Sequence, residues 1–112
     1  MRKQEASWNQ GDIASFMNGY WKSDSLMFIG SRGLSKGYNT TLDNYKSSYP
    51  DSSAMGRLEF INKEIRRLEN HHALVIGFWT LYRSLDTLGG MYSLTWRWNS
   101  ERGWEIIADH SS

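Results

Sequence analysis

The chain has 112 residues, of which 39% are hydrophobic, enough apolar surface for one core but not for two. It contains 13 basic and 12 acidic residues, so its formal charge of +1 favours neither nucleic acid nor an anionic membrane as a partner. There is no cysteine, which excludes disulfides and thiolate chemistry. We expect one domain over residues 1–112.

No apolar run approaches the roughly 20 residues of a membrane helix, so no membrane partner is expected. The polar start Met1-Arg2-Lys3-Gln4 does not resemble a signal peptide. We therefore expect a soluble domain, either cytoplasmic or, if a native leader has been removed, exported.

The first segment, Lys3 to Tyr20, has the apolar spacing of a helix that is broken at Gly11-Asp12. Asp12 is suited to be the N-cap of the second piece, because its carboxylate can accept from the backbone of the next turn. Gly19 stands where that helix should end.

A short apolar strand is predicted at Leu26 to Ile29, followed by a tight turn at Ser31-Arg32-Gly33. The next helix is predicted from Asn39 to Tyr49, with Asn39 or Thr40 as its cap. Pro50 should stop it, because proline cannot continue a helix.

After Pro50 the hydrophobic period changes to that of strands. Short connections that are polar or contain glycine, including Asp86 to Gly90, separate these strands and favour hairpins. The sequence therefore predicts an antiparallel meander behind the leading helices. The predicted strands are Arg57–Leu68, Ala73–Ser84, Met91–Asn99 and Trp104–Ser111.

Both faces of these strands carry apolar residues. In the second strand Val75, Trp79 and Leu81 lie on one side, with Phe78 and Tyr82 on the other. We expect one face to pack on the helices. In so short a chain, a second copy is the expected cover for the outer face, which makes the protein a homodimer.

This order of elements resembles the nuclear transport factor 2-like superfamily, a cone-shaped α+β, cystatin-like fold, and in detail its SnoaL-like group of small bacterial domains of unknown function. That group is similar to the association domain of calcium/calmodulin-dependent kinase. The residues that carry the resemblance are Trp8-Asn9-Gln10-Gly11-Asp12, Tyr20-Trp21, Ser31-Arg32-Gly33, Gly37, Tyr45, Tyr49-Pro50, Gly77, Trp79, Trp96-Arg97, Trp104 and Asp109-His110-Ser111-Ser112.

The resemblance implies the fold more strongly than any activity, because one fold hosts many functions. Ketosteroid isomerase-like members place a general-base carboxylate at the end of the first short strand. Here that stretch is Phe28-Ile29-Gly30-Ser31, which contains no carboxylate, so steroid isomerisation of that type is not expected.

The candidate acid or base is Asp109 or His110. Neighbours on a strand point to opposite faces, so only one of the two can enter an internal cavity. This argues against a catalytic pair, and it leaves each residue open as a lone acid or base or as a group that orients a ligand.

Arg32 follows the first strand in a turn that should lie at the mouth of a cavity. A guanidinium there can bind a carboxylate or phosphate with two parallel hydrogen bonds, and the alternative is a surface ion pair or a structural hydrogen bond to a nearby carbonyl. Aromatic residues should form both the core and the cavity wall. The predicted ligand-binding residues are Arg32, Trp21, Tyr45, Tyr49, Trp79, Tyr92, Trp96 and His110.

No metal or cofactor site is predicted. His71 and His72 are adjacent in an extended segment and diverge, and no further ligand completes a set. Gly89-Gly90 lacks the lysine and the helix of a phosphate-binding loop.

Three functions remain open. The first is a homodimeric domain that binds a small, partly apolar molecule, whose anionic group, where it has one, is held by Arg32. The second is a cofactor-free lyase or isomerase that uses His110 or Asp109 together with a tyrosine. The third is an oligomerisation module whose cavity is a by-product of the fold.

Overall fold

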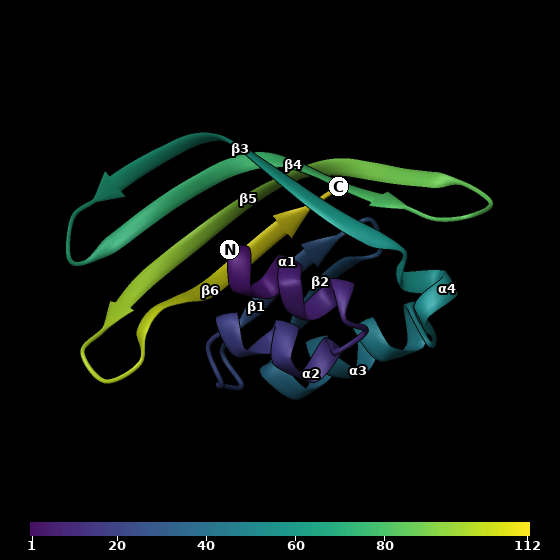
Figure 1. Ribbon diagram of the computed structural model, residues 1–112. Coiled ribbons are helices and arrows are strands. Elements are labelled where there is room, and N and C mark those ends of the chain that lie inside the picture. Colours follow the sequence, from purple (N-terminus) through teal and green to yellow (C-terminus); the bar gives the residue numbers. More distant parts are fainter.

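Six strands form one curved sheet, and four α-helices with a short 3₁₀ helix lie against its concave side (Figure 1). The computed structural model describes all 112 residues. The elements are α1 (Arg2–Asn9), α2 (Ile13–Phe16), η1 (Met17–Gly19), β1 (Met27–Gly30), β2 (Gly33–Lys36), α3 (Tyr38–Ser48), α4 (Ser52–Met55), β3 (Arg57–Leu68), β4 (His72–Tyr82), β5 (Thr87–Asn99) and β6 (Gly103–Ser111).

The sheet order is β2-β1-β6-β5-β4-β3. All neighbours are antiparallel except β1 and β6, which pair in parallel and bring the first hairpin beside the last strand. The α+β fold with a long antiparallel meander is therefore confirmed. None of the helices has the length and apolar character needed to cross a membrane.

The predicted break in the first helix is confirmed, and Asp12 caps α2 by accepting a hydrogen bond of 3.0 Å from the Ser15 amide. The predicted cap of α3 is wrong. Gly37, with φ of +98°, precedes the helix, and neither Asn39 nor Thr40 makes a capping hydrogen bond. A glycine is favoured there because the backbone enters the helix through a conformation that side chains disfavour.

The predicted loop from Asp86 to Gly90 is also wrong. The turn is shorter, because Arg83 and Asp86 close it with a backbone hydrogen bond of 3.0 Å and an ion pair. Gly89 and Gly90 are extended and pair with β4. At Gly90 a side chain would collide with the Ser112 carbonyl, so this glycine permits close packing and does not form a turn.

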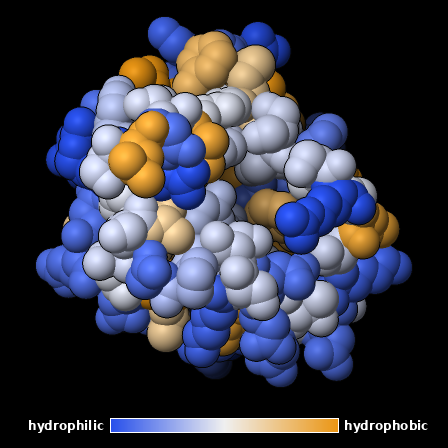
Figure 2. Space-filling model, turned by 90° about the vertical axis from the view of Figure 1, so that its right-hand side faces the viewer, coloured by the Kyte–Doolittle hydropathy of each residue, from blue (hydrophilic) through white to orange (hydrophobic).

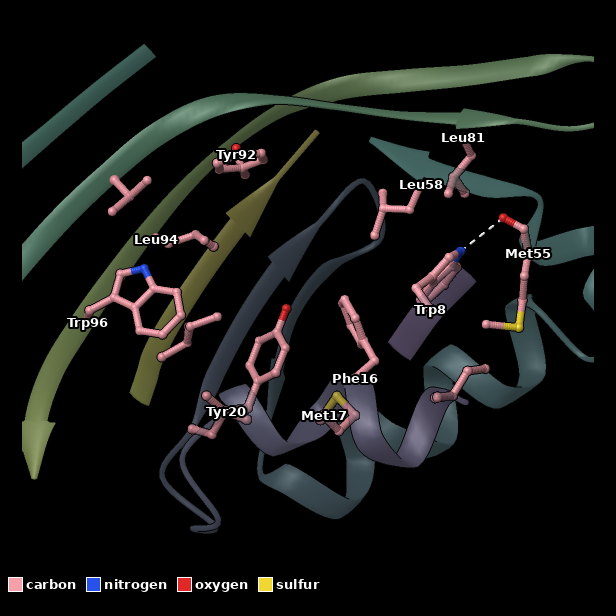
Figure 3. Packing of buried hydrophobic residues seen from close by; sticks show 14 of the residues in the cluster. Trp8, Phe16, Met17, Tyr20, Met55, Leu58, Leu81, Tyr92, Leu94 and Trp96 are labelled. Carbon is pink, nitrogen blue, oxygen red and sulfur yellow. Dashed lines mark hydrogen bonds between the residues drawn. The ribbon is translucent and has the colours of Figure 1, made fainter. Parts of the chain in front are cut away.

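Two β-bulges bend the sheet. In β3 the extra residue is Lys63, between Asn62 and Glu64, and in β6 it is Ile107, which has no partner between Thr95 and Trp96 of β5. The resulting concave face holds the core (Figure 3). Trp8 is part of this core, with its ring 5.0 Å from that of Phe16 and its indole N–H donating to the Met55 carbonyl at 3.0 Å.

Candidate functional site

A cavity of about 770 Å³ lies between the concave face of the sheet and the helices. Figure 2 views the end of the molecule that carries α4 and the β4–β5 hairpin, and it shows a hollow edged mainly by pale and blue, less hydrophobic residues. Half of the 30 lining residues are hydrophobic. The rings in the wall are those of Trp8, Phe16, Tyr20, Phe28, Tyr45, Tyr49, Phe60, Trp79 and Tyr92.

A polar cluster lies in this otherwise ring-lined wall and is centred on Asp109, which is only 4% exposed. The Tyr20 hydroxyl donates to its Oδ2 and the Ser111 hydroxyl to its Oδ1, each at 2.6 Å. The Tyr45 hydroxyl lies 3.4 Å from that of Tyr20. Figure 3 shows the Tyr20 hydroxyl directed from the helices towards the sheet.

Burial controls the electrostatics of this cluster. It raises the pKa of Asp109 because the carboxylate loses hydration, although the hydrogen bonds from Ser111 and Tyr20 oppose the rise. Burial and the nearby Asp109 also raise the pKa of Tyr20 well above its usual range, and they raise that of Tyr45. Both phenols therefore remain protonated at neutral pH and act as hydrogen-bond donors.

Another part of the wall, at the turn after β1, carries Arg32, whose side chain forms no hydrogen bond or ion pair. Arg83 also lines the cavity, but its guanidinium is held by Asp86 and by the Ala54 carbonyl. Hydroxyl and amide side chains share the lining with Arg32. They are Ser31, Ser35, Asn44, Ser47 and Ser48.

Two further polar groups of the wall have no partner. The Oε1 atom of Gln4 and the Nε1 atom of Trp79 are buried and make no hydrogen bond. Buried polar groups normally find partners, so these two atoms are exceptions within an otherwise satisfied interior.

The structure brings five of the predicted binding residues to the cavity wall. They are Arg32, Tyr45, Tyr49, Trp79 and Tyr92. Tyr92 is anchored there by donating to Asn62 Oδ1 at 2.6 Å, and burial raises its pKa to about 12.

Three predicted residues lie elsewhere. Trp21 follows the helices, where Arg97 lies 4.4 Å from its ring centroid. Trp96 faces the concave side and pairs with Ile106, but it packs into the core and does not line the cavity (Figure 3). His110 is exposed and lies on the outer face, as the register with Ser93 requires.

Asp109 therefore enters the cavity and His110 does not, as expected for neighbours on a strand. Strict alternation along the sequence predicts that His110 shares a face with Ile106. The bulge between Thr95 and Trp96 reverses the alternation, so that Asp109 and Ile106 face the same way.

Sequence reasoning missed Ser111 and the bridging role of Tyr20. Ser111 lies two residues after Asp109, the spacing that places two side chains on one face of a strand, and this signal was present in the sequence. The contact of Tyr20 with Asp109 spans 89 positions and has no local signal.

No group of three or more histidine, cysteine, aspartate or glutamate side chains is arranged to hold a metal ion. His71 lies in the β3–β4 turn with φ of +62°, and the Nδ1 atom of His72 lies 3.3 Å from the Glu69 carbonyl.

Solved structures share this fold along nearly the whole chain. A nuclear transport factor 2-like protein of unknown function from Shewanella oneidensis is 40% identical, with a TM-score of 0.93, over 99% of this chain and 91% of that one. No family model and no curated protein matches the sequence.

Two more distant structures show the fold alone. A candidate calcium/calmodulin-dependent protein kinase type II association domain from Thiobacillus denitrificans is 16% identical, with a TM-score of 0.80, over 99% of this chain and 89% of that one. A ketosteroid isomerase-like protein from Erwinia carotovora is 15% identical, with a TM-score of 0.73, over 99% and 88%.

Proposed function

The chain belongs to the nuclear transport factor 2-like family, and from this premise we propose that its cavity binds a small, partly apolar molecule that carries an anionic group. Arg32 would hold the anionic group, and the rings of the wall would surround the apolar body. Proteins of this fold act in several different ways, so the proposal is based on the cavity itself.

The observation that carries the proposal is a guanidinium without a partner beside a ring-lined cavity of about 770 Å³. The neighbouring Arg83 is already bound to Asp86, so Arg32 is the arginine of the wall that remains free for an anion. Guanidinium groups bind carboxylates and phosphates with paired, charge-assisted hydrogen bonds.

The experiment compares 3-phenylpropanoate with its uncharged amide, using thermal shift and titration calorimetry. We expect the acid to bind and Arg32→Gln to weaken it about tenfold, the lower part of the range for charge-assisted hydrogen bonds because Arg32 is exposed. The matched control is Arg2→Gln, which removes an exposed arginine of α1 that forms no hydrogen bond or ion pair and does not line the cavity. Equal binding of acid and amide, or equal losses in the two variants, would contradict the proposal.

A second candidate function is proton-transfer catalysis without a cofactor, such as a lyase or isomerase. The observation in its favour is the buried Asp109 with a raised pKa, hydrogen-bonded to Tyr20 inside the cavity. Such a carboxylate can accept a proton that a neighbouring tyrosine returns. His110 is less suited to this role because it faces outward.

Exchange of solvent deuterium into a bound acid tests this second function. Exchange that is lost in Asp109→Asn, while the acid still binds, would support catalysis. If acids bind without exchange, whether or not a carbonyl group lies next to the exchangeable hydrogen, the catalytic proposal is contradicted and the cavity is a binding site only.

We further propose that two copies associate through the outer face of the sheet. Ile61, Phe78 and Met91 lie side by side across β3, β4 and β5 and are between 39% and 46% exposed. Basic and acidic side chains, Arg66 and Glu64, border this apolar row on β3. A surface with both charges is compatible with an antiparallel copy of itself. If the protein serves only for assembly, the dimer should form and no acid should bind.

A further inference from the structure

In the cluster around Asp109, the hydroxyl hydrogens of Tyr20 and Ser111 both point towards its carboxylate. Tyr20 and Ser111 each have one hydroxyl hydrogen, and each donates it to a carboxylate oxygen at 2.6 Å. Because the hydrogen of Tyr20 is used in this way, any hydrogen bond across the 3.4 Å contact between the two phenols is donated by Tyr45.

The carboxylate at the centre of the cluster therefore offers only acceptor positions to a molecule in the cavity. An ionised carboxylate has about four lone-pair positions, and two hydroxyls fill only two of them. The ion pairs of the chain all involve other residues, so no cation neutralises Asp109. The lengths of 2.6 Å lie within the range of hydroxyl groups that donate to an ionised oxygen.

We propose that the cavity selects its ligand by a hydrogen-bond donor, a hydroxyl or an ammonium group, that binds Asp109 at the end remote from Arg32. The inference rests on the proposed function, because it assumes that Arg32 holds the anionic group. The ligand class is then a hydroxy acid or an amino acid whose two polar ends are separated by an apolar or aromatic body.

The arrangement of the strands sets the distance between the two ends. Asp109 pairs with Phe28 of β1, and Arg32 lies in the turn just beyond Gly30, where β1 ends. Three strand steps from Phe28 to Ser31 cover on the order of 10 Å. A substituted aromatic ring with an acidic side chain opposite the donor is suited to this span.

A ligand that presents only an acceptor at this end would meet Asp109 with no hydrogen between the two groups. A carbonyl or an ether in that position would lose its water and gain no hydrogen bond. Sites built to satisfy a polar group discriminate strongly against analogues that leave that group unpaired.

The experiment uses four probes that differ only at the ring position opposite the acidic side chain. They are 3-(4-hydroxyphenyl)propanoate and 3-(4-aminomethylphenyl)propanoate as donors, and the 4-methyl and 4-methoxy analogues as non-donors. We expect at least one donor probe to bind wild-type protein about tenfold more tightly than both non-donors. Equal affinities, or tighter binding of the methoxy analogue, would overturn the inference.

Two variants locate the acceptor. Asp109→Asn introduces N–H donors, so we expect the advantage of the donor probe over the methoxy probe to disappear. Tyr45→Phe leaves the carboxylate in place, so the advantage should persist. If the advantage instead survives in Asp109→Asn and is lost in Tyr45→Phe, Asp109 is not the acceptor. Circular dichroism confirms that each variant is folded, and the wild-type comparison decides the inference without any variant.

The outcomes separate this inference from the proposed function. If the methyl analogue binds in an Arg32-dependent way and the donors have no advantage, the anion site stands and the donor selection fails. If none of the four acids binds, both fail.

Discussion

The burial of Asp109 gives the stability of this protein a pH dependence opposite to that of an ordinary surface carboxylate. Its pKa is raised in the folded state, so the folded protein holds a proton at pH values where the unfolded chain has released it. Its contribution to stability is therefore complete below the unfolded pKa of about 3.9 and is lost as the pH rises through the folded pKa.

We predict that the free energy of unfolding of wild type relative to Asp109→Asn falls as the pH rises from about 3.5 towards 7. The loss is about 1.4 kcal/mol for each unit by which folding raises the pKa of Asp109. Urea unfolding at a series of pH values measures this loss of unfolding free energy.

In Tyr20→Phe the Asp109 carboxylate loses a hydrogen-bond donor, so its pKa should rise further. The loss of unfolding free energy should then extend to higher pH. If the unfolding free energy of wild type relative to Asp109→Asn instead increases with pH, the fold stabilises the carboxylate and the prediction is wrong.

Among the helices and strands, the sequence predicted what depends on periodicity and failed where long-range packing decides. The break before α2, its Asp12 cap and the four long strands follow local rules, and they are present. The error at Gly90 arose because glycine is common in turns, whereas here it avoids a collision with Ser112, a residue distant in sequence.

The same distinction explains the cavity. The sequence predicts Arg32 and Tyr45 in the cavity wall, because a turn and the face of a helix can each be recognised from neighbouring residues. The sequence wrongly predicts Trp96 in the cavity wall, because periodicity shows which face of a strand a residue lies on but not where along the strand the cavity lies. His110 and Asp109 could not be told apart, because a bulge that reverses the alternation leaves no mark in the sequence.

For the whole molecule, the two faces of the sheet have different environments. The concave face is covered by the helices, while the outer face retains an apolar row at Ile61, Phe78 and Met91. Contiguous apolar surface of this kind commonly marks an interface.

We predict by light scattering a particle of twice the chain mass of 13.0 kDa. Met91→Glu places a charge in the apolar row and should yield monomer. The control is Leu85→Glu, which changes a residue that is 97% exposed in the β4–β5 turn and should leave the mass unchanged. A monomeric wild type, or dissociation by both substitutions, would contradict association through this face.

The parallel pairing of β1 with β6 affects how the protein folds and unfolds. Asp109 and Ser111 arrive with the last strand, whereas Tyr20 and Tyr45 come from the first half of the chain, so the cluster forms only after the chain has closed on itself. Such late, non-local closure is slow, because the entropy of a long loop is lost before any contact compensates for it. A molecule bound across Asp109 and Arg32 would join the last strand to the β1–β2 turn, and it would retard the opening of the entire domain rather than the fraying of one edge.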